Sequence, residues 1–249
     1  MIYPELGYIG QFHMTDATTG KQQLLDYINQ LKEQGHSKIV APINGSTWQS
    51  YRLVSFSDDT ISPFPKEPDN PLWYNEVYKE VGFTPLHTYY SEIFHIGYGL
   101  KFNRGLDIRQ FSPADFKAIY EIASVSFQDN FMFSPISYED FAQLYGRSAQ
   151  AGNDSDYIAL AYVDNKPVGF IFSYVFNNAL VLKTMAVLPE YRSLGIGAGL
   201  INHVCTVAKE NGVKKAIGAL ISSGNHSGKI VSKYGSKVFR EYTLYTYTS

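Results

Sequence analysis

The chain contains very little cysteine, since Cys205 is the only one among its 249 residues. A single cysteine cannot form an intrachain disulfide, which excludes a disulfide-stapled fold and suits a reducing compartment, so we expect a cytoplasmic location. Because Cys205 lies within a predicted helix, we interpret it as a packing residue rather than a nucleophile. The sequence has neither cysteine pairs nor clustered histidines, so we expect no metal site.

Long apolar runs are also missing. No stretch approaches the roughly 18 apolar residues needed to cross a bilayer. The N-terminal segment MIYPELGYIG lacks a basic segment followed by an apolar core. We therefore expect neither a membrane partner nor a signal peptide. Hydrophobic residues make up 45% of the chain and charged residues 18%, which predicts a folded globular protein.

The net charge is small, at −2, which argues against general nucleic-acid binding. Its distribution is uneven. Residues 1–100 carry 6 basic and 11 acidic side chains (6 − 11 = −5), whereas residues 101–249 carry 15 and 12 (15 − 12 = +3). A mildly basic half suits a polyphosphate cofactor, and an acidic half suits a cationic substrate. Ordinary surface variation accounts for the difference equally well.

Residues 178–200 have the most informative pattern in the chain. Apolar and β-branched residues at 179–187 predict a buried strand, which Pro189 ends because proline cannot donate to a sheet ladder. A loop with Gly195 and Gly197 follows, and apolar residues then recur at helical spacing. The first N–H groups of a helix are unpaired and lie at its positive end, and glycines allow an anion to approach them. This order predicts a phosphate-binding loop.

Two kinds of phosphate-binding loop have this order. A dinucleotide fold requires G-x-G-x-x-G and an acidic residue about 20 positions later. Here the loop reads G-x-G-x-G, and the later region holds Lys214 and Lys215. The second pattern, V-x-P-x-x-R-x-x-G-x-G, fits at five positions: Val187, Pro189, Arg192, Gly195 and Gly197. It resembles the acyl-CoA-binding signature of the GCN5-related N-acetyltransferases (the GNAT superfamily), over residues 105–249. A plain turn with packing glycines is the alternative.

Hydrophobic periodicity predicts alternating strands and helices along the rest of the chain. In the first part we expect strands at 8–14, 38–43, 51–56 and 84–96, a helix capped by Thr15 or Asp16, and a helix capped by Asn70. In the second part we expect strands at 106–109, 157–163, 168–175, 179–187, 215–221 and 238–247, and helices at 112–127, 138–150, after Gly197 and at 225–235. The predicted fold class is α/β (α+β), a mixed central sheet flanked by helices, in the element order of the GNAT family.

A short repeat links the two parts of the chain. Lys32-Glu33-Gln34-Gly35 and Lys209-Glu210-Asn211-Gly212 each end a predicted helix before a strand, at an offset of 212 − 35 = 177 residues. We interpret residues 1–100 as a partial, degenerate GNAT-like module and residues 101–249 as the acyl-CoA-binding domain, a tandem arrangement. Common helix-end chemistry is the alternative explanation.

The first copy lacks the phosphate-binding loop. Arg192, Gly195 and Gly197 would correspond to Thr15, Thr18 and Gly20, so only one glycine is kept. We therefore expect one cofactor per chain.

The resemblance implies transfer of an acyl group from a CoA thioester to an amine, with acetyl-CoA as donor. The pyrophosphate would bind the N–H groups of residues 193–198, and the pantetheine would pair with residues 185–187 where two strands splay apart. Asn225 matches an asparagine that bonds the pantetheine, although it is also a plausible helix cap. Lys229 either reaches a CoA phosphate or is solvated. The implied cofactor-binding residues are Met185, Ala186, Val187, Arg192, Ser193, Leu194, Gly195, Ile196, Gly197, Ala198, Asn225 and Lys229.

The sequence departs from the family at the catalytic positions. Lys183 and Thr184 stand where many members carry a carboxylate base, and Ser232 stands where many carry a tyrosine acid. Tyr234 follows two residues later, and we expect its ring to pack against the final strand. Ser232 and Tyr234 are the catalytic candidates.

Two functions remain open from the sequence. The first is an N-acetyltransferase for a small-molecule amine, with an acceptor site built from residues 126–150 and the N-terminal half. The second is a catalytically inactive CoA-binding sensor or assembly module, which the missing carboxylate and tyrosine motivate. The sequence does not identify the acceptor or decide whether the chain forms a homodimer.

Overall fold

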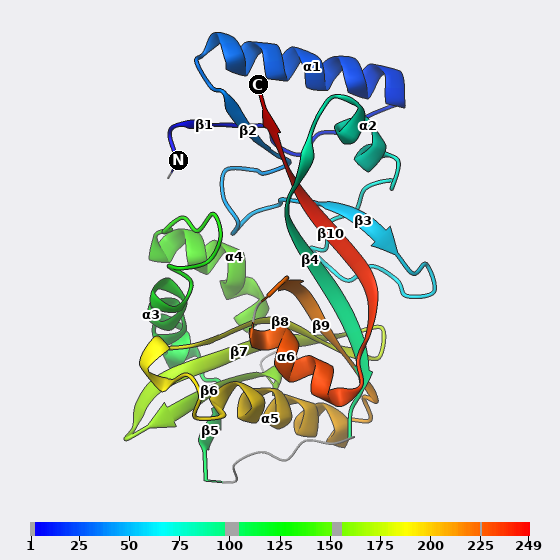
Figure 1. Ribbon diagram of the computed structural model, residues 1–249. Coiled ribbons are helices and arrows are strands. Elements are labelled where there is room, and N and C mark those ends of the chain that lie inside the picture. Colours follow the sequence, from blue (N-terminus) through cyan, green and yellow to red (C-terminus); the bar gives the residue numbers. More distant parts are fainter. Residues whose placement is uncertain (1–2, 98–104, 151–155, 225) are drawn as a thin grey trace. The chain divides into compact units, whose positions relative to one another are not determined.

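The computed structural model describes residues 3–97, 105–150, 156–224 and 226–249, which form two compact units (Figure 1). Unit 1 comprises Met1–Tyr90, Phe131–Ser134 and Phe239–Ser249. Unit 2 comprises Ser91–Asn130 and Pro135–Val238. The units are therefore not consecutive pieces of chain, because each contains a segment from the part of the chain that mainly forms the other.

Unit 1 combines a small sheet with two helices. Its sheet order is β1-β2-β10-β4, and β3 pairs with β10. The β1–β2 pair is parallel and the β2–β10 pair is antiparallel. The elements are β1 (Leu6–Tyr8), α1 (Ala17–Glu33), β2 (Lys38–Ala41), β3 (Leu53–Ser57), α2 (Tyr74–Glu80), the first part of β4 (Thr84–His95) and most of β10 (Lys237–Thr248).

The two helices of unit 1 begin in different ways. The predicted cap of α1 is confirmed, since the Asp16 carboxylate accepts a hydrogen bond from the Thr19 N–H (2.8 Å). The predicted cap of α2 is wrong. The Asn70 amide instead bonds both backbone groups of Val54 at β3, and α2 begins only at Tyr74. Because the Asn70 side chain bonds to a strand in the tertiary structure, it does not cap the helix that follows it in the sequence.

Both faces of the unit 1 sheet are covered. Ile39 on β2 packs in a core with Leu24 and Ile28 of α1, together with Tyr78 and Tyr245. The next residue, Val40, points to the opposite face, because side chains alternate along a strand. There it packs in a second cluster with Ile43, Met132 and Leu244.

Unit 2 contains the remaining elements. Its sheet order is β4-β9-β8-β7-β6-β5, antiparallel from β5 to β8 and parallel between β8 and β9. The strands are the end of β4, β5 (Asp107–Gln110), β6 (Ile158–Val163), β7 (Lys166–Phe176), β8 (Ala179–Val187) and β9 (Lys215–Ser222). The helices are α3 (Phe116–Ser126), α4 (Tyr138–Gln150), α5 (Ile196–Glu210) and α6 (His226–Val231), with 3₁₀ turns η1 (Pro113–Asp115), η3 (Pro189–Tyr191) and η4 (Ser232–Tyr234).

Helices lie on both faces of the unit 2 sheet (Figure 1). An ideal Cβ on Gly169 of β7 would lie 3.3 Å from Ile196 of α5. Phe172, three residues later on the same strand, faces the opposite way and contacts Tyr145 of α4 (centroid distance 5.5 Å). The predicted mixed sheet flanked by helices is therefore confirmed.

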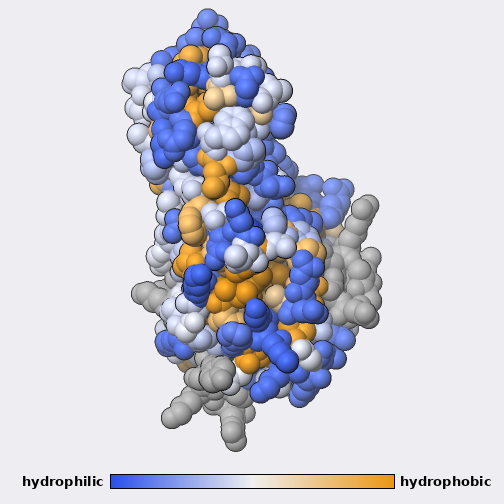
Figure 2. All heavy atoms as spheres, turned by 90° about the vertical axis from the view of Figure 1, so that its right-hand side faces the viewer, coloured by the Kyte–Doolittle hydropathy of each residue, from blue (hydrophilic) through white to orange (hydrophobic). Residues whose placement is uncertain are grey.

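The surface mixes polar and apolar residues. On the face shown in Figure 2, apolar residues gather in the lower part of the picture and hydrophilic residues surround them. Leu194, in the loop before α5, is 54% exposed. Within the described parts of the chain, no helix is both long enough and apolar enough to cross a bilayer.

Candidate acyl-CoA site

The two central strands of unit 2 separate partway along their length. The ladder between β8 and β9 runs from Ala179–Lys215 to Leu182–Gly218 and ends there. Both strands continue, β8 to Val187 and β9 to Ser222. On its other edge β8 stays paired with β7 as far as Val187. Over residues 185–187, β8 therefore has no strand partner on its β9 side in the described structure, which leaves that edge open to an extended ligand.

Irregularities in both strands produce this separation. Lys183 is an extra residue in β8, since Thr184 pairs with Phe172 and Leu182 pairs with Ser173. A bulge of this kind bends the strand. On β9, Leu220 adopts a positive φ of 56°. Its N–H donates to the hydroxyl of Ser91 on β4, the strand on the other side of β9 (3.0 Å).

The loop after β8 leads directly to the N-terminus of α5. Ser193 and Gly195 have positive φ angles of 74° and 79°. No described side chain caps the helix, which begins at Ile196 with Gly195 as its N-cap. The first N–H groups of α5 are therefore available to an anion, at the positive end of the helix dipole.

Gly195 and Gly197, the two glycines of the predicted signature, have different structural roles. An ideal Cβ on Gly195 would have no heavy atom within 4 Å, so the space beside its backbone is open. A Cβ on Gly197 would lie 3.2 Å from Ile230 Cδ1 and 3.4 Å from Met185 Cε. Gly195 thus leaves room for a ligand, whereas Gly197 allows α5 to pack closely.

Arg192 is held by main-chain oxygens. Its Nε donates to the Val187 carbonyl (3.3 Å) and its Nη2 donates to the Ser126 carbonyl (3.0 Å). These bonds connect the loop to the ends of β8 and α3. The predicted role of Arg192, adding charge near a pyrophosphate, stays a prediction. The observed role is to fix the path of the loop.

Most of the predicted cofactor-binding residues lie along this route. Residues 185–187 lie at the separated end of β8, and residues 193–198 form the loop and the first turn of α5. Asn225 lies outside the described residues. Lys229 lies in α6, but its side chain is outside the described part. The parts of the site that the structure describes are therefore the strand and the loop.

The two catalytic candidates differ in environment. Ser232 is exposed in η4. Tyr234 is 8% exposed, and its hydroxyl has no hydrogen-bond partner within the described residues. Its ring packs on Phe94 of β4 (centroid distance 4.6 Å), and the expected packing against the final strand stays a prediction. Burial, with a smaller contribution from Cys205, raises the Tyr234 pKa far above its usual value.

A buried carboxylate in unit 2 was missed by the sequence analysis. Glu92 on β4 is 4% exposed, and its Oε2 accepts a hydrogen bond from the Ser236 hydroxyl (2.6 Å). Burial raises the pKa of this carboxyl, and the bond from Ser236 opposes that rise. The only sequence signal was a single acid in an aromatic strand. No group of three metal-binding side chains occurs in the described ranges.

The place in unit 1 that the proposed repeat aligns with the start of α5 is closed. At the start of α1, the Asp16 carboxylate occupies the positive end of the helix, and bonds from Thr19 hold its pKa below the usual value. Strands β1 and β2 do not separate, because Ile9 N–H donates to Val40 O (3.1 Å) and Ile43 N–H donates to Ile9 O (2.9 Å). Among the described residues, the start of α1 is therefore occupied and the β1–β2 pair has no gap.

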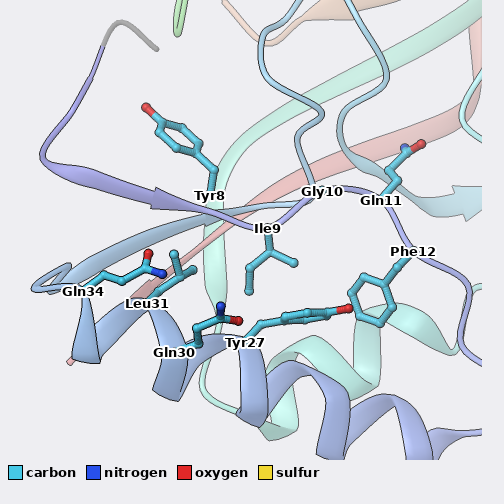
Figure 3. A pocket seen from close by; sticks show the side chains of 9 residues that line it. All are labelled: Tyr8, Ile9, Gly10, Gln11, Phe12, Tyr27, Gln30, Leu31 and Gln34. Atoms are coloured by element: carbon cyan, nitrogen blue, oxygen red, sulfur yellow. The ribbon is translucent and has the colours of Figure 1, made fainter.

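Unit 1 does have a groove beside α1, with a volume of about 380 Å³. Figure 3 shows Ile9 pointing toward α1 and Tyr8 pointing away from it. The lining is aromatic, aliphatic and amide in character: Tyr8, Ile9, Gly10, Gln11, Phe12, Tyr27, Gln30, Leu31 and Gln34. A lining without charged side chains offers no cation to a polyphosphate.

We predict that each chain binds one CoA molecule. The closed helix start and the paired strands of unit 1 leave unit 2 as the only half with the required features among the described residues. Isothermal titration of the full chain with CoA should give a stoichiometry of one. A stoichiometry of two would show that unit 1 kept a cofactor site, and would contradict the degenerate-copy interpretation.

Comparisons with known proteins agree with this geometry. Residues 116–228 match the family described as "Acetyltransferase (GNAT) family". A GCN5-related N-acetyltransferase from Sphaerobacter thermophilus aligns with a TM-score of 0.63 and 14% identity, over 92% of this chain and 67% of that one. A tandem GNAT protein from the clavulanic acid biosynthesis pathway aligns with a TM-score of 0.53 and 11% identity, over 94% and 71%. No curated protein matches the chain. At these identities the structural likeness shows the fold.

Proposed function

The chain carries a domain of the GNAT acetyltransferase family at residues 116–228, and from this premise we propose that it is an N-acetyltransferase acting from acetyl-CoA on a small amine. One observation carries the proposal. The gap between β8 and β9 opens after Leu182, and β8 leads through Gly195 into an uncapped helix start. An extended pantetheine and a pyrophosphate require these two features in this order.

The proposed roles follow from the backbone. Residues 185–187 pair with the amides of the pantetheine arm, and the N–H groups of residues 193–198 bind the pyrophosphate. A backbone N–H at the separated end of β8 also donates to the thioester carbonyl oxygen as negative charge develops there. The amine nitrogen attacks the thioester carbon, the carbon–sulfur bond breaks, and the nitrogen gives up a proton as the amide forms. The departing thiolate takes up a proton.

This chemistry does not require a tyrosine acid. A CoA thiol has a pKa of roughly 8.5, by analogy with cysteine, so its thiolate is a fair leaving group near neutral pH. A general acid typically contributes about 10²–10⁴-fold to a rate. The buried Tyr234 hydroxyl has a raised pKa and is therefore a poor proton donor. Water or the exposed Ser232 would protonate the thiolate instead.

We predict that Tyr234→Phe lowers kcat by less than about tenfold, since a general acid would account for at least about 100-fold. The substitution removes a hydroxyl that has no partner in the described structure and keeps the ring on Phe94. Ser232→Ala is the comparison variant, at the exposed position of η4. The measurement is kcat with a saturating amine, together with CoA affinity. A hundredfold loss in Tyr234→Phe with intact CoA affinity would show that the acid lies there.

The proposed function is tested by incubating the full chain with acetyl-CoA and a panel of polyamines, amino acids and aminoglycosides. Release of free thiol and the mass of the product are measured together. An acetylated amine formed in step with free thiol supports the proposal. Tight CoA binding with no acetylated product across the panel would indicate a sensor or assembly module instead.

A further inference from the structure

Arg52 occupies an unusual place in unit 1, immediately before β3. It is 6% exposed. Its guanidinium carbon lies 4.0 Å from the ring centroid of Tyr51, 4.2 Å from that of Tyr89 and 5.7 Å from that of Tyr242. Aromatic rings therefore line the guanidinium, an arrangement that leaves its in-plane N–H groups to find other partners.

Those N–H groups lack partners in the described structure. Nε and Nη1 of Arg52 are buried and make no hydrogen bond within it. The buried acid of this unit, Glu67, is already engaged: it pairs with Arg240 (2.6 Å) and accepts a hydrogen bond from Tyr242. A buried cation without hydrogen bonds or a counter-charge is strongly disfavoured. Its partner is therefore to be sought outside the described chain.

The backbone at Arg52 is also held in an uncommon conformation. Its φ is +70°, in the left-handed region that favours glycine. Its N–H donates to the Pro42 carbonyl (2.9 Å), and its carbonyl accepts from Gln11 Nε2 (3.3 Å). Strain of this kind persists where the surroundings fix it and is concentrated at functional sites.

The surroundings of Arg52 favour a ligand with a single negative charge. Burial, and then the charge of Arg52, lowers the pKa of His87, so this imidazole is held neutral. One guanidinium balances one carboxylate, whereas a phosphate dianion would need a second cation. A planar carboxylate also fits the paired N–H groups of a guanidinium.

We propose that Arg52 anchors a binding site for the carboxylate of a small molecule in unit 1. The carboxylate has two sources, the amine acceptor itself or a separate ligand. The acceptor as source, but not the carboxylate site itself, rests on the proposed acetyltransferase function.

Binding is tested without acetyl-CoA, so that the result does not depend on catalysis. The probes are α-amino acids and the corresponding carboxamides. Their binding to the full chain is measured by saturation-transfer NMR. The amide keeps the shape of the acid and loses its charge, so acids should bind about 10- to 100-fold more tightly, which is the usual range for a hydrogen bond to a charged group. Equal binding of acids and amides by the unmodified protein would overturn the proposal and needs no variant.

Variants assign the preference to Arg52. Arg52→Met should bring acids and amides to equal affinity, and Arg52→Lys, which keeps the charge without the planar group, should retain part of the preference. Arg109→Met is the matched control, since Arg109 also lies over a tyrosine (Tyr162, 4.1 Å) but is paired with Asp107. Its acid preference should be unchanged. A full acid preference in folded Arg52→Met would overturn the proposal.

Kinetics then distinguish the two sources of the carboxylate. If the acceptor carries it, Arg52→Met should raise KM for amino acids about 10- to 100-fold with little change in kcat, and leave KM for the amides unchanged. If acids and amides are equal as acceptors while acids still bind preferentially, the carboxylate belongs to a separate ligand. If no amine is acetylated, the proposed function fails while the carboxylate site stands on the NMR result.

Discussion

Gly195→Glu is expected to abolish CoA binding while leaving the protein folded. The space beside Gly195 is open, so the new side chain meets no protein atom near its Cβ. It places a negative charge at the uncapped start of α5, where we propose that the pyrophosphate binds. Juxtaposing like charges costs several kcal/mol, and each 1.4 kcal/mol is about tenfold in affinity. A loss of at least about 100-fold should follow.

The substitution also strains the backbone, so a control is needed. Gly195 has a φ of 79°, and a residue with a Cβ in that region costs roughly 1–2 kcal/mol. Gly212, at the other end of the same helix, has a φ of 82° and equally open space. Gly212→Glu therefore adds the same charge and similar strain away from the site.

Calorimetric titration with CoA compares the two variants. We expect Gly212→Glu to bind like the unmodified protein and Gly195→Glu to show no measurable heat, although both melt at similar temperatures. Unchanged CoA affinity in folded Gly195→Glu would remove the basis of the assigned site.

Residues 101–249 expressed alone are expected not to fold stably. We propose that residues 1–100 and 101–249 are the two modules of a tandem protein, yet the compact units do not follow that boundary. The fragment would lack Ser91–His95, which belong to unit 2, where β4 is the neighbour of β9. It would also keep Phe239–Ser249, which belong to unit 1, without their surroundings.

The expected loss of stability is large because the part of β10 that would be left without the rest of unit 1 carries large apolar side chains. Phe239, Tyr242, Leu244 and Tyr245 are almost completely buried in unit 1. Fully burying one large apolar side chain contributes about 1.5–3 kcal/mol. Four such side chains approach the whole stability of a typical domain, about 5–15 kcal/mol.

The fragment expressed alone is compared with the same fragment co-expressed with residues 1–100 as a separate chain. We expect 101–249 alone to be insoluble or to lack a cooperative melting transition, and co-expression to recover soluble protein that binds CoA. A soluble fragment with the CoA affinity of the full chain would show that residues 1–100 are an independent appendage.

Local chemistry was readable from the sequence wherever neighbouring residues decide the structure. The repeated helix ends are the clearest case. Gly35 and Gly212 both adopt positive φ angles, of 91° and 82°, and each donates its N–H to the carbonyl three residues earlier. Asp16 caps α1 as predicted. Strand β8 has the predicted bounds, because its apolar run is flanked by Asn178 and Pro189.

Side-chain contacts could not be predicted from the sequence where a segment far along the chain determines them. Asn70 bonds to Val54 rather than capping its own helix, and the contact between Tyr234 and Phe94 was not foreseen. The isolated Glu92 and Arg52 gave no pattern at all. Their environments arise from burial and from neighbours far along the chain, which periodicity and spacing do not encode.

The most direct test of the account is a crystal structure of the full chain grown with CoA. We predict that the pantetheine lies between β8 and β9 beyond Leu182, pairing with residues 185–187, and that the pyrophosphate contacts the N–H groups of residues 193–198. Unit 1 should hold no CoA. CoA bound elsewhere, with the gap between β8 and β9 empty, would contradict the assignment of this gap as the acyl-CoA site.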